Sequence, residues 1–388
     1  MQSIRNILQI FREEFSTVIR DSGVWIFFVL LNLAYPVIYT YIYSNESVHE
    51  VPVAVVDHDF SSASRDFIRR WDASANVNVI ARCNDIEEAK RLWYKKDILG
   101  ILEVPKSFGS DINTGKQTNV SLFTDMGGLL NYKALLMSAS SVAQLSGKEI
   151  QVKDLTYALP TTQELTASPI RIEEVKLFNP ESGYASFIIP AILILVIQQS
   201  LLLGIGTLAG TARDRNKGHL LPTGYLTRFR NPFQIITGKA MAYFTVYVVM
   251  IVWVYVVVPG IFNLTRIGLK LDLFIFLLPF LLSSIFMAIS FSFLSKEREA
   301  PFFIFVFTSV PLMFLSGISW PIEAIPHYWK TISHIFPSTF GIEGYTKIAN
   351  MGSTLNELLP EWYSLWLLTV VYFFISAYLY YRAMRVKF

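Results

Sequence analysis

Long apolar runs most constrain how this chain of 388 residues can fold. A helix needs about 20 mostly apolar residues to cross the hydrocarbon core of a bilayer. Five such runs lie between Tyr184 and Tyr381, and a sixth lies near the N-terminus. The runs cover roughly residues 24–43, 184–208, 234–258, 272–294, 301–318 and 362–381. The sequence therefore predicts an α-helical integral membrane protein with six transmembrane helices.

Composition points the same way. The chain is 53% hydrophobic and 16% charged, whereas a soluble domain carries about 25% charged residues. A net charge of +3 is too small to indicate nucleic acid as a partner. The single cysteine, Cys83, excludes an intrachain disulfide, and we expect it to be inert and partly buried.

Lys and Arg predict the orientation of the spans. They gather before the first run, after the second, after the fourth and after the sixth. These residues are Arg5, Arg12, Arg20, Arg213, Arg215, Lys217, Arg228, Arg230, Lys239, Lys296, Arg298, Arg382, Arg385 and Lys387. The alternation predicts that both termini are cytoplasmic and that residues 44–183 form an extracytoplasmic domain.

The segment 44–183 has the pattern of an α/β domain. Strands are expected at 51–56, 77–82, 98–104 and 119–124, with short helices between them and a longer helix at 128–145. Residues 170–175 are a candidate return strand. The cluster Asp57-His58-Asp59 admits a metal site, but a polar turn after the first strand is the favoured interpretation.

Residues 1–23 predict an amphipathic helix in the membrane interface. Seven apolar side chains fall largely on one helical face, and burying them would leave Arg12, Glu13 and Glu14 in water. The alternative is a cytoplasmic extension of the first span. The polar break from Arg20 to Gly23 favours the interfacial helix.

Two connecting segments also stand out. The cytoplasmic segment 209–239 mixes charge, Gly and Pro, which either reflects orientation alone or makes it a docking element with an apolar anchor at Leu220 and Leu221. The outer segment 316–345 is aromatic and apolar, and prolines break it into short helices. We expect a hairpin that re-enters the outer leaflet, with irregular backbone covered by protein.

No catalytic or nucleotide-binding motif is present, including the phosphate-binding loop of many ATPases. Asn32, Gln198 and Gln199 lie inside the runs and are expected to join helices, with a place on a transport pathway as the less favoured alternative. We expect no buried Asp, Glu, Lys or Arg in the spans, which argues against a carrier coupled to protons or ions.

Several motifs together resemble the permease subunits of ABC-2 type exporters that carry a large domain between the first two spans. The resemblance covers nearly the whole chain and is most specific in the outer hairpin. It rests on 11–15 with Arg20-Asp21, on 53–57 and 100–108, on 213–218 with Gly238-Lys239, and on 316–321, 335–337 and 342–344. One departure is Gly218-His-Leu-Leu221, where the family often has Gly-Thr and then an acidic residue.

The resemblance implies a division of labour. This chain would bind no cofactor and no metal and would catalyse nothing, while ATP and Mg would be bound by separate cytoplasmic ABC ATPase subunits. A second permease, identical or paralogous, would complete the transporter in a bacterial inner membrane. The cargo would be an amphipathic or hydrophobic drug, peptide or lipid. A periplasmic adaptor is left open, as is the alternative of an ATP-coupled mechanical or signalling protein without cargo.

The resemblance also assigns residues to roles. The residues that it assigns to ATPase coupling are Arg213, Asp214, Arg215, Lys217, Gly218, Leu220 and Leu221. The interfacial helix contributes Phe11, Arg12, Glu13, Phe15, Arg20 and Asp21. The re-entrant hairpin contributes Gly317, Trp320, Pro321, Pro326, Pro337 and Glu343.

Overall fold

The structure is a computed structural model, and it separates into two compact units. It describes residues 2–43, 48–125, 128–154, 184–216, 218–220, 228–229, 231–262, 270–317, 320 and 322–385. The helical unit comprises Met1–Glu46 and Lys176–Phe388, and the sheet unit comprises Ser47–Val175. The candidate strand 170–175 and the residues Lys217, Leu221 and Pro321 lie outside the described residues.

The sheet unit is a four-stranded sheet with helices on both faces. In chain order its elements are β1 (Val51–Asp57), α4 (Ser62–Asp72), β2 (Val77–Cys83), α5 (Ile86–Tyr94), β3 (Gly100–Val104), α6 (Phe108–Asn113), β4 (Ser121–Thr124) and α7 (Leu129–Asp154). The strand order is β2-β1-β3-β4, with only β4 antiparallel to its neighbour. The strands lie close to their predicted positions, and α7 extends nine residues beyond the expected 145 (154 − 145).

Burial explains the arrangement of this sheet. The central strand β1 is apolar on both faces, as strands covered on both sides usually are. On one face Trp71 of α4 is fully buried, and its indole N–H donates to the hydroxyl of Ser138 in α7 at 3.0 Å. On the other face Ala89 of α5 packs over Ala54 and Ile101. The sheet unit therefore has its own hydrophobic core.

The helical unit contains the remaining elements. They are α1 (Gln2–Arg20), α2 (Ser22–Trp25), η1 (Ile26–Leu30), α3 (Leu31–Ile42), α9 (Tyr184–Arg215), α11 (Pro232–Val252), η2 (Trp253–Val257), α12 (Val258–Ile261), α13 (Lys270–Phe291), η3 (Ser292–Leu294), α14 (Ala300–Leu315), η4 (Ile322–Ala324), α15 (His327–Ser333), α16 (Pro337–Met351), η5 (Leu355–Leu358) and α17 (Leu359–Arg385). Long apolar stretches explain why α9, α11, α13 and α17 each extend beyond 20 residues.

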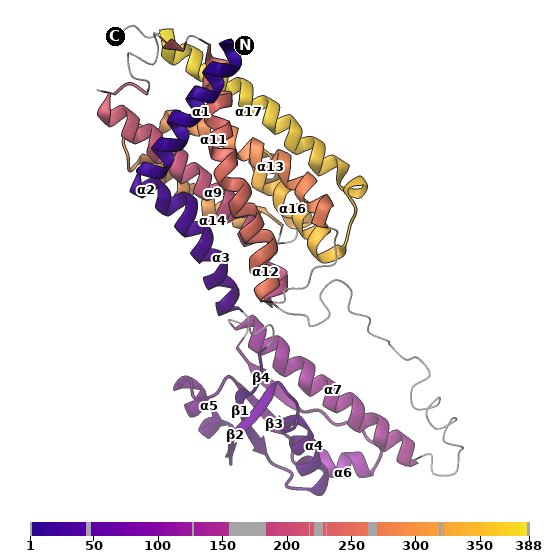
Figure 1. The fold of residues 1–388 in the computed structure, drawn as a ribbon. Coiled ribbons are helices and arrows are strands. Elements are labelled where there is room, and N and C mark those ends of the chain that lie inside the picture. The colour runs from indigo at the N-terminus through magenta and orange to yellow at the C-terminus, as the bar shows by residue number, and fades with distance from the viewer. Residues whose placement is uncertain are drawn as a thin grey trace. The chain divides into compact units, whose positions relative to one another are not determined.

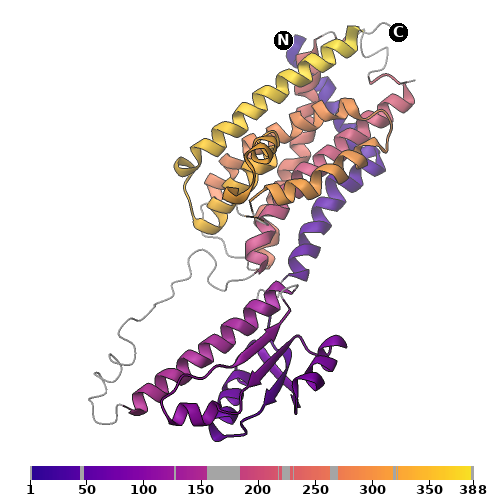
Figure 2. The ribbon, with the colours of Figure 1, turned by 180° about the vertical axis from the view of Figure 1, so that it is seen from behind.

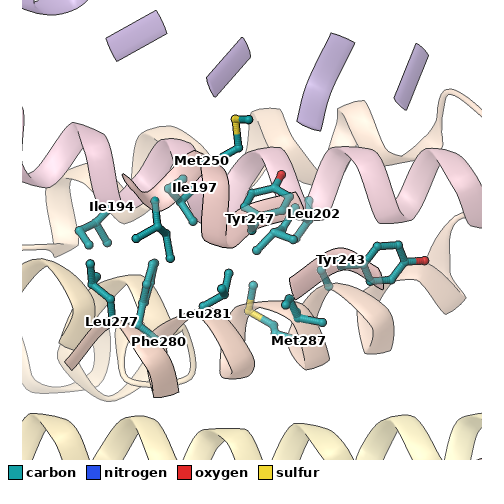
Figure 3. Packing of buried hydrophobic residues seen from close by; sticks show 14 of the residues in the cluster. Ile194, Ile197, Leu202, Tyr243, Tyr247, Met250, Leu277, Phe280, Leu281 and Met287 are labelled. Carbon is teal, nitrogen blue, oxygen red and sulfur yellow. The ribbon is translucent and has the colours of Figure 1, made fainter. Parts of the chain in front are cut away.

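The helix α9 is the centre of this unit. Its apolar window is buried throughout, and it packs against α3, α13, α14 and α16. Figure 3 shows side chains of α9, α11 and α13 meeting in this core, among them Ile197, Tyr247 and Phe280. Gly204 lets the Phe28 ring approach the backbone of α9 closely, because a Cβ at this position would lie 2.0 Å from that ring. The helix α17 lies on the outside of the unit (Figures 1 and 2).

Five of the described helical segments are long and apolar enough to span a membrane. They are Ser22–Ile42, Ile188–Arg215, Pro232–Ile261, Leu271–Leu294 and Leu355–Arg385. The predicted fifth run, 301–318, forms the shorter apolar helix Ala300–Leu315. At about 1.5 Å per residue, its 16 residues measure about 24 Å, less than the ~30 Å hydrocarbon core.

Candidate functional site

One end of the helical unit gathers most of the residues that the sequence assigned to coupling. We call it the basal end. It carries the start of α1 and the final turn of α17 (Figure 1), together with the end of α9, the start of α11 and the turn 292–299 between α13 and α14. Segments far apart in the sequence are joined here by charged and polar contacts.

The helix α1 lies along α11 and is fastened to it by a buried ion pair. Glu14 accepts a hydrogen bond from the Lys239 ammonium at 2.6 Å and another from the Tyr243 hydroxyl. The expectation that Glu14 would be in water is wrong, because Glu14 is only 8% exposed. It falls on the same helical stripe as Ile10 and Val18, which α11 covers. Burial of the carboxylate is tolerated because two donors satisfy it.

A glycine allows this close packing. A Cβ at Gly238 would lie 2.7 Å from the Cβ of Ile10 and 3.0 Å from the carbonyl oxygen of Ile7. Gln234, one turn before Gly238, contacts Asn6 and donates to Ser3 at 3.0 Å. The helix α1 is therefore held on α11 from its first turn to Glu14.

The polar break after α1 has a defined structure. The Asp21 carboxylate caps α2 by accepting hydrogen bonds from the N–H groups of Gly23 and Val24. It also accepts one from the Arg298 guanidinium at 2.9 Å. Asp21 therefore ends one helix, begins the next, and ties both to the turn 292–299.

Arg213 ties the end of α9 to the same turn. Its guanidinium donates to the backbone carbonyls of Ser292 and Phe293 at 3.0 and 3.1 Å, and also to that of Ser295. These carbonyls lie at the end of a helix, where a cation is favourable. Gly210 adds a close contact, since a Cβ there would lie 2.3 Å from the carbonyl oxygen of Glu297. The structure thus turns the Arg213 side chain inward, whereas Asp214 and Arg215 are exposed.

A cavity of about 460 Å³ opens between these elements. Its charged lining comes from α1, the end of α9 and Lys239, and its floor is apolar. The lining residues are Glu13, Glu14, Ser16, Thr17, Arg20, Asp21, Ile205, Leu208, Ala209, Thr211, Ala212, Arg215, Asn216, Leu220, Lys239, Tyr243, Ile289, Ser292 and Tyr380. The structure therefore brings Arg20, Asp21, Arg215 and Leu220 together around one space. Phe11 and Phe15 stack on each other along α1, while Arg12 is exposed.

The residues predicted to form an outer hairpin are spread over α15, α16 and the turns before them. Gly317 has a φ of +85°, which glycine adopts readily, and Trp320 is 57% exposed. Pro326 precedes α15, and Pro337 is the first residue of α16. The helix α16 is largely buried, because Gly341 and Gly344 let it approach α13.

Two acidic residues of α16 and α17 share one lysine. The Lys347 ammonium donates to Glu343 at 2.9 Å and to Glu361 at 2.6 Å. Desolvation opposes the charge on Lys347, but these hydrogen bonds outweigh it and raise the lysine's pKa. Glu361 is 7% exposed and belongs to the candidate span Leu355–Arg385. Glu361 lies just before the predicted run 362–381, and Lys239, inside the predicted run 234–258, is half-buried and paired with Glu14. Charged side chains are therefore tolerated near the ends of these runs because partner charges compensate them.

The polar residues inside the spans join helices. Asn32 is fully buried and donates to the Ser200 hydroxyl at 3.0 Å, and Tyr247 donates to the same hydroxyl at 2.8 Å. Gln198 accepts from the backbone N–H of Ser338, and Gln199 donates to the Thr308 hydroxyl. These bonds connect α9 to α3, α11, α14 and α16.

The polar cluster after β1 forms a turn. Asp57 accepts from the N–H groups of Asp59 and Phe60 and from the Ser64 hydroxyl, while Asp59 accepts from the Gly109 N–H. Among the described residues, no group of three or more His, Cys, Asp or Glu side chains is placed to hold a metal ion. Cys83 is buried, and this burial raises the pKa of its thiol.

A comparison with known protein families shows to which family this chain belongs. The model of the ABC-2 family transporter protein matches residues 22–378, which is most of the chain. The chain belongs to the ABC-2 transporter family. No curated protein matches it significantly. As a member of this family, the chain is a multi-pass membrane component of a transporter, and its sequence carries no nucleotide-binding motif of its own.

Because the chain belongs to a transporter family, we treat the basal end as its candidate functional site. Sequence reasoning found Arg213, Arg20 and Asp21 there but missed Tyr243 and Tyr380. Arg298 was used only to orient the spans, and Lys239 was counted as a basic residue and as part of the Gly238-Lys239 motif, without its partner Glu14. The signal that could have found its role was Glu14 itself, an acidic residue on the apolar face of an amphipathic helix. Such a residue needs a cationic or hydrogen-bonding partner when that face is buried.

Proposed function

We propose that this chain is the membrane permease subunit of an ATP-driven exporter, powered by separate ATPase subunits that dock at the basal end. One observation carries the proposal: α1, the end of α9, the start of α11 and the turn 292–299 are fastened into one assembly by Glu14–Lys239, Asp21–Arg298 and Arg213. A force applied anywhere on this assembly reaches at least four membrane helices. The family match supports a transport role for such a device.

The mechanism follows from rigid packing. Closure of the ATPase subunits would press on the exposed side chains of the assembly, and the helices joined to it would shift together. A second copy of the permease, or a paralogue, would provide the other half of the pathway. The cargo we propose is an amphipathic or hydrophobic drug, peptide or lipid, released outward.

The order in which the chain visits the two ends of the helical unit supports six spans with both termini in the cytoplasm. The turn 292–299 lies at the basal end, whereas Glu361 at the start of α17 contacts α16 at the opposite end. The chain must therefore return across the unit between them, and α14 is the helix that begins this return. We propose that α14 crosses with help from the turns that follow it, in a bacterial inner membrane.

Labelling tests this orientation. In a Cys83→Ser background, Tyr94→Cys places a thiol on a side chain that is 85% exposed in the sheet unit, and Glu297→Cys places one on the turn 292–299. A membrane-impermeant maleimide should label the first in intact spheroplasts and the second only after permeabilisation. The reverse pattern would contradict the proposed orientation.

Co-purification tests the coupling. The chain is tagged and isolated in mild detergent, and an ABC ATPase is sought by mass spectrometry. Asp214→Lys and Lys296→Glu reverse charges at exposed positions of the assembly, and Lys95→Glu reverses an exposed charge in the sheet unit as a control. We expect the first two variants to lose the ATPase and the control to keep it. Absence of any ATPase from the folded wild type would overturn the proposal.

A further inference from the structure

Two cationic side chains that line the basal cavity have no carboxylate partner among the described residues. Three carboxylates and three cationic side chains line it. Each carboxylate has a cationic partner: Glu14 pairs with Lys239 at 2.6 Å, Asp21 with Arg298 at 2.9 Å, and Glu13 with Arg228 at 3.6 Å. Two lining cations, Arg20 and Arg215, are left over.

These two guanidinium groups have no partner among the residues that the structure describes. Arg20 is the last residue of α1 and Arg215 the last residue of α9, so the cavity lies between two helix ends that both bear a cation. Guanidinium groups that line one cavity suit an oxyanion, since each offers several N–H donors in a planar fork.

The other lining residues narrow the choice of ligand further. Thr211 is 7% exposed, and its hydroxyl has no hydrogen-bond partner among the described residues. Apolar side chains also line the cavity, among them Ile205, Leu208, Ala209 and Ile289, and we call these four its apolar floor. A volume of about 460 Å³ far exceeds a single phosphate ion and falls in the usual range of ligand pockets. Cations above an apolar floor fit an amphiphile better than a soluble anion.

We propose that the basal cavity binds the phosphate-bearing headgroup of an anionic phospholipid between Arg20 and Arg215. The position agrees with this ligand, because the cavity lies at the ends of membrane-spanning segments, where headgroups are found. α1 also exposes Ile4, Leu8 and Ile19, which suits a helix in contact with the interface. The phosphodiester of a bound lipid would bring one negative charge to the two arginines, accept hydrogen bonds from both, and so join the end of α1 to the end of α9.

Native mass spectrometry of the full chain provides the test. Wild-type protein is incubated with phosphatidylglycerol or phosphatidylcholine, and the retained lipid is counted. We expect tight retention of phosphatidylglycerol alone. Removal of one charge-assisted hydrogen bond should weaken retention about tenfold, so Arg20→Gln/Arg215→Gln should weaken it about a hundredfold.

A matched control removes the same charge elsewhere. Arg5 on α1 and Arg382 on α17 are exposed and do not line the cavity, so Arg5→Gln/Arg382→Gln should keep full retention. Arg20→Lys/Arg215→Lys should restore most of it, which a folding defect in the Gln pair would not explain. Equal loss in the control pair would overturn the proposal, as would equal retention of phosphatidylcholine.

A competition arm separates the two sources of phosphate. Inorganic phosphate is titrated against retained phosphatidylglycerol at constant ionic strength. We expect no displacement at millimolar phosphate, because phosphate ion gains nothing from the apolar floor. Full displacement would assign the site to a soluble anion and overturn the lipid proposal. None of these outcomes depends on an ATPase, so the proposal stands or falls separately from the proposed coupling.

Discussion

The ion pair between Glu14 and Lys239 is the interaction whose removal should most weaken the basal end. It joins α1 to α11 at 2.6 Å, and the Tyr243 hydroxyl donates to the same carboxylate. We expect Glu14→Ala to free the middle of α1 from α11 and to remove the Glu14 carboxylate from the half-buried Lys239 ammonium. The helices themselves should remain, because neither depends on this pair for its own hydrogen bonds.

Burial sets the magnitude. An exposed ion pair contributes about 0–1 kcal/mol, whereas removing one partner of a buried pair costs about 3–5 kcal/mol. The Lys239 and Glu14 side chains are only 16% and 10% exposed, so the pair lies nearer the buried limit. We therefore expect Glu14→Ala to lower the free energy of unfolding by about 3 kcal/mol. Glu14→Gln should cost about 1–2 kcal/mol, because its amide oxygen still accepts from Tyr243.

A double-mutant cycle with Lys239→Ala measures the pair, using reversible unfolding in mixed micelles followed by circular dichroism. The double variant should be more stable than the sum of the single losses by about 2 kcal/mol, since it removes both charges of the pair. The neighbouring pair Glu13–Arg228 is a control, because its side chains are 41% and 58% exposed and 3.6 Å apart. Its cycle should give about 0–1 kcal/mol. Additive losses at Glu14 and Lys239 would refute the reasoning.

Three further predictions address other contacts. Gly238→Val should cost about 1–3 kcal/mol by overpacking against Ile10 and should expose α1 to protease, whereas Gly147→Ala, in open space on α7, should not destabilise. Arg213→Gln should speed amide hydrogen exchange in residues 292–299, because it removes donors from three carbonyls; unchanged exchange would show that the turn does not need them. Hydrogen bonds from Arg69 and Arg70 lower the pKa of Asp66, so its stabilising contribution should be complete above the unfolded value of about 3.9 and be lost as the pH falls through the lower folded value. Carboxyl NMR should find the Asp66 midpoint below 3.9, and a midpoint at or above about 3.9 would contradict this.

The sequence predicted the parts of the fold that have a strong local signal. Apolar runs marked five spans and the shorter α14, and alternating strand and helix patterns marked the sheet. Asp21 could be recognised as a break because it can cap a following helix, and the structure uses it so. The helices and strands could therefore be predicted without knowing how they pack against one another.

The roles of individual charges could not be predicted in the same way. Glu14 was expected in water because helical periodicity alone does not show which face a neighbouring helix will cover. Arg213 was grouped with Arg215 as a basic loop residue, although its side chain turns inward onto backbone carbonyls. A contact with backbone carbonyls cannot be predicted from residue types, since every residue has a backbone carbonyl. Glu361 was missed because its partner, Lys347, belongs to another helix.

The central claim is that a separate ATPase drives this permease through the basal end. Its most direct test is ATP-dependent export in proteoliposomes containing the chain and the ATPase that co-purifies with it, with a fluorescent amphiphile as cargo. We predict transport that requires ATP and both proteins, and that Asp214→Lys abolishes while Lys95→Glu leaves it intact. Transport by the chain alone, or ATP hydrolysis by both proteins together without movement of any amphiphilic, peptide or lipid cargo, would contradict the account.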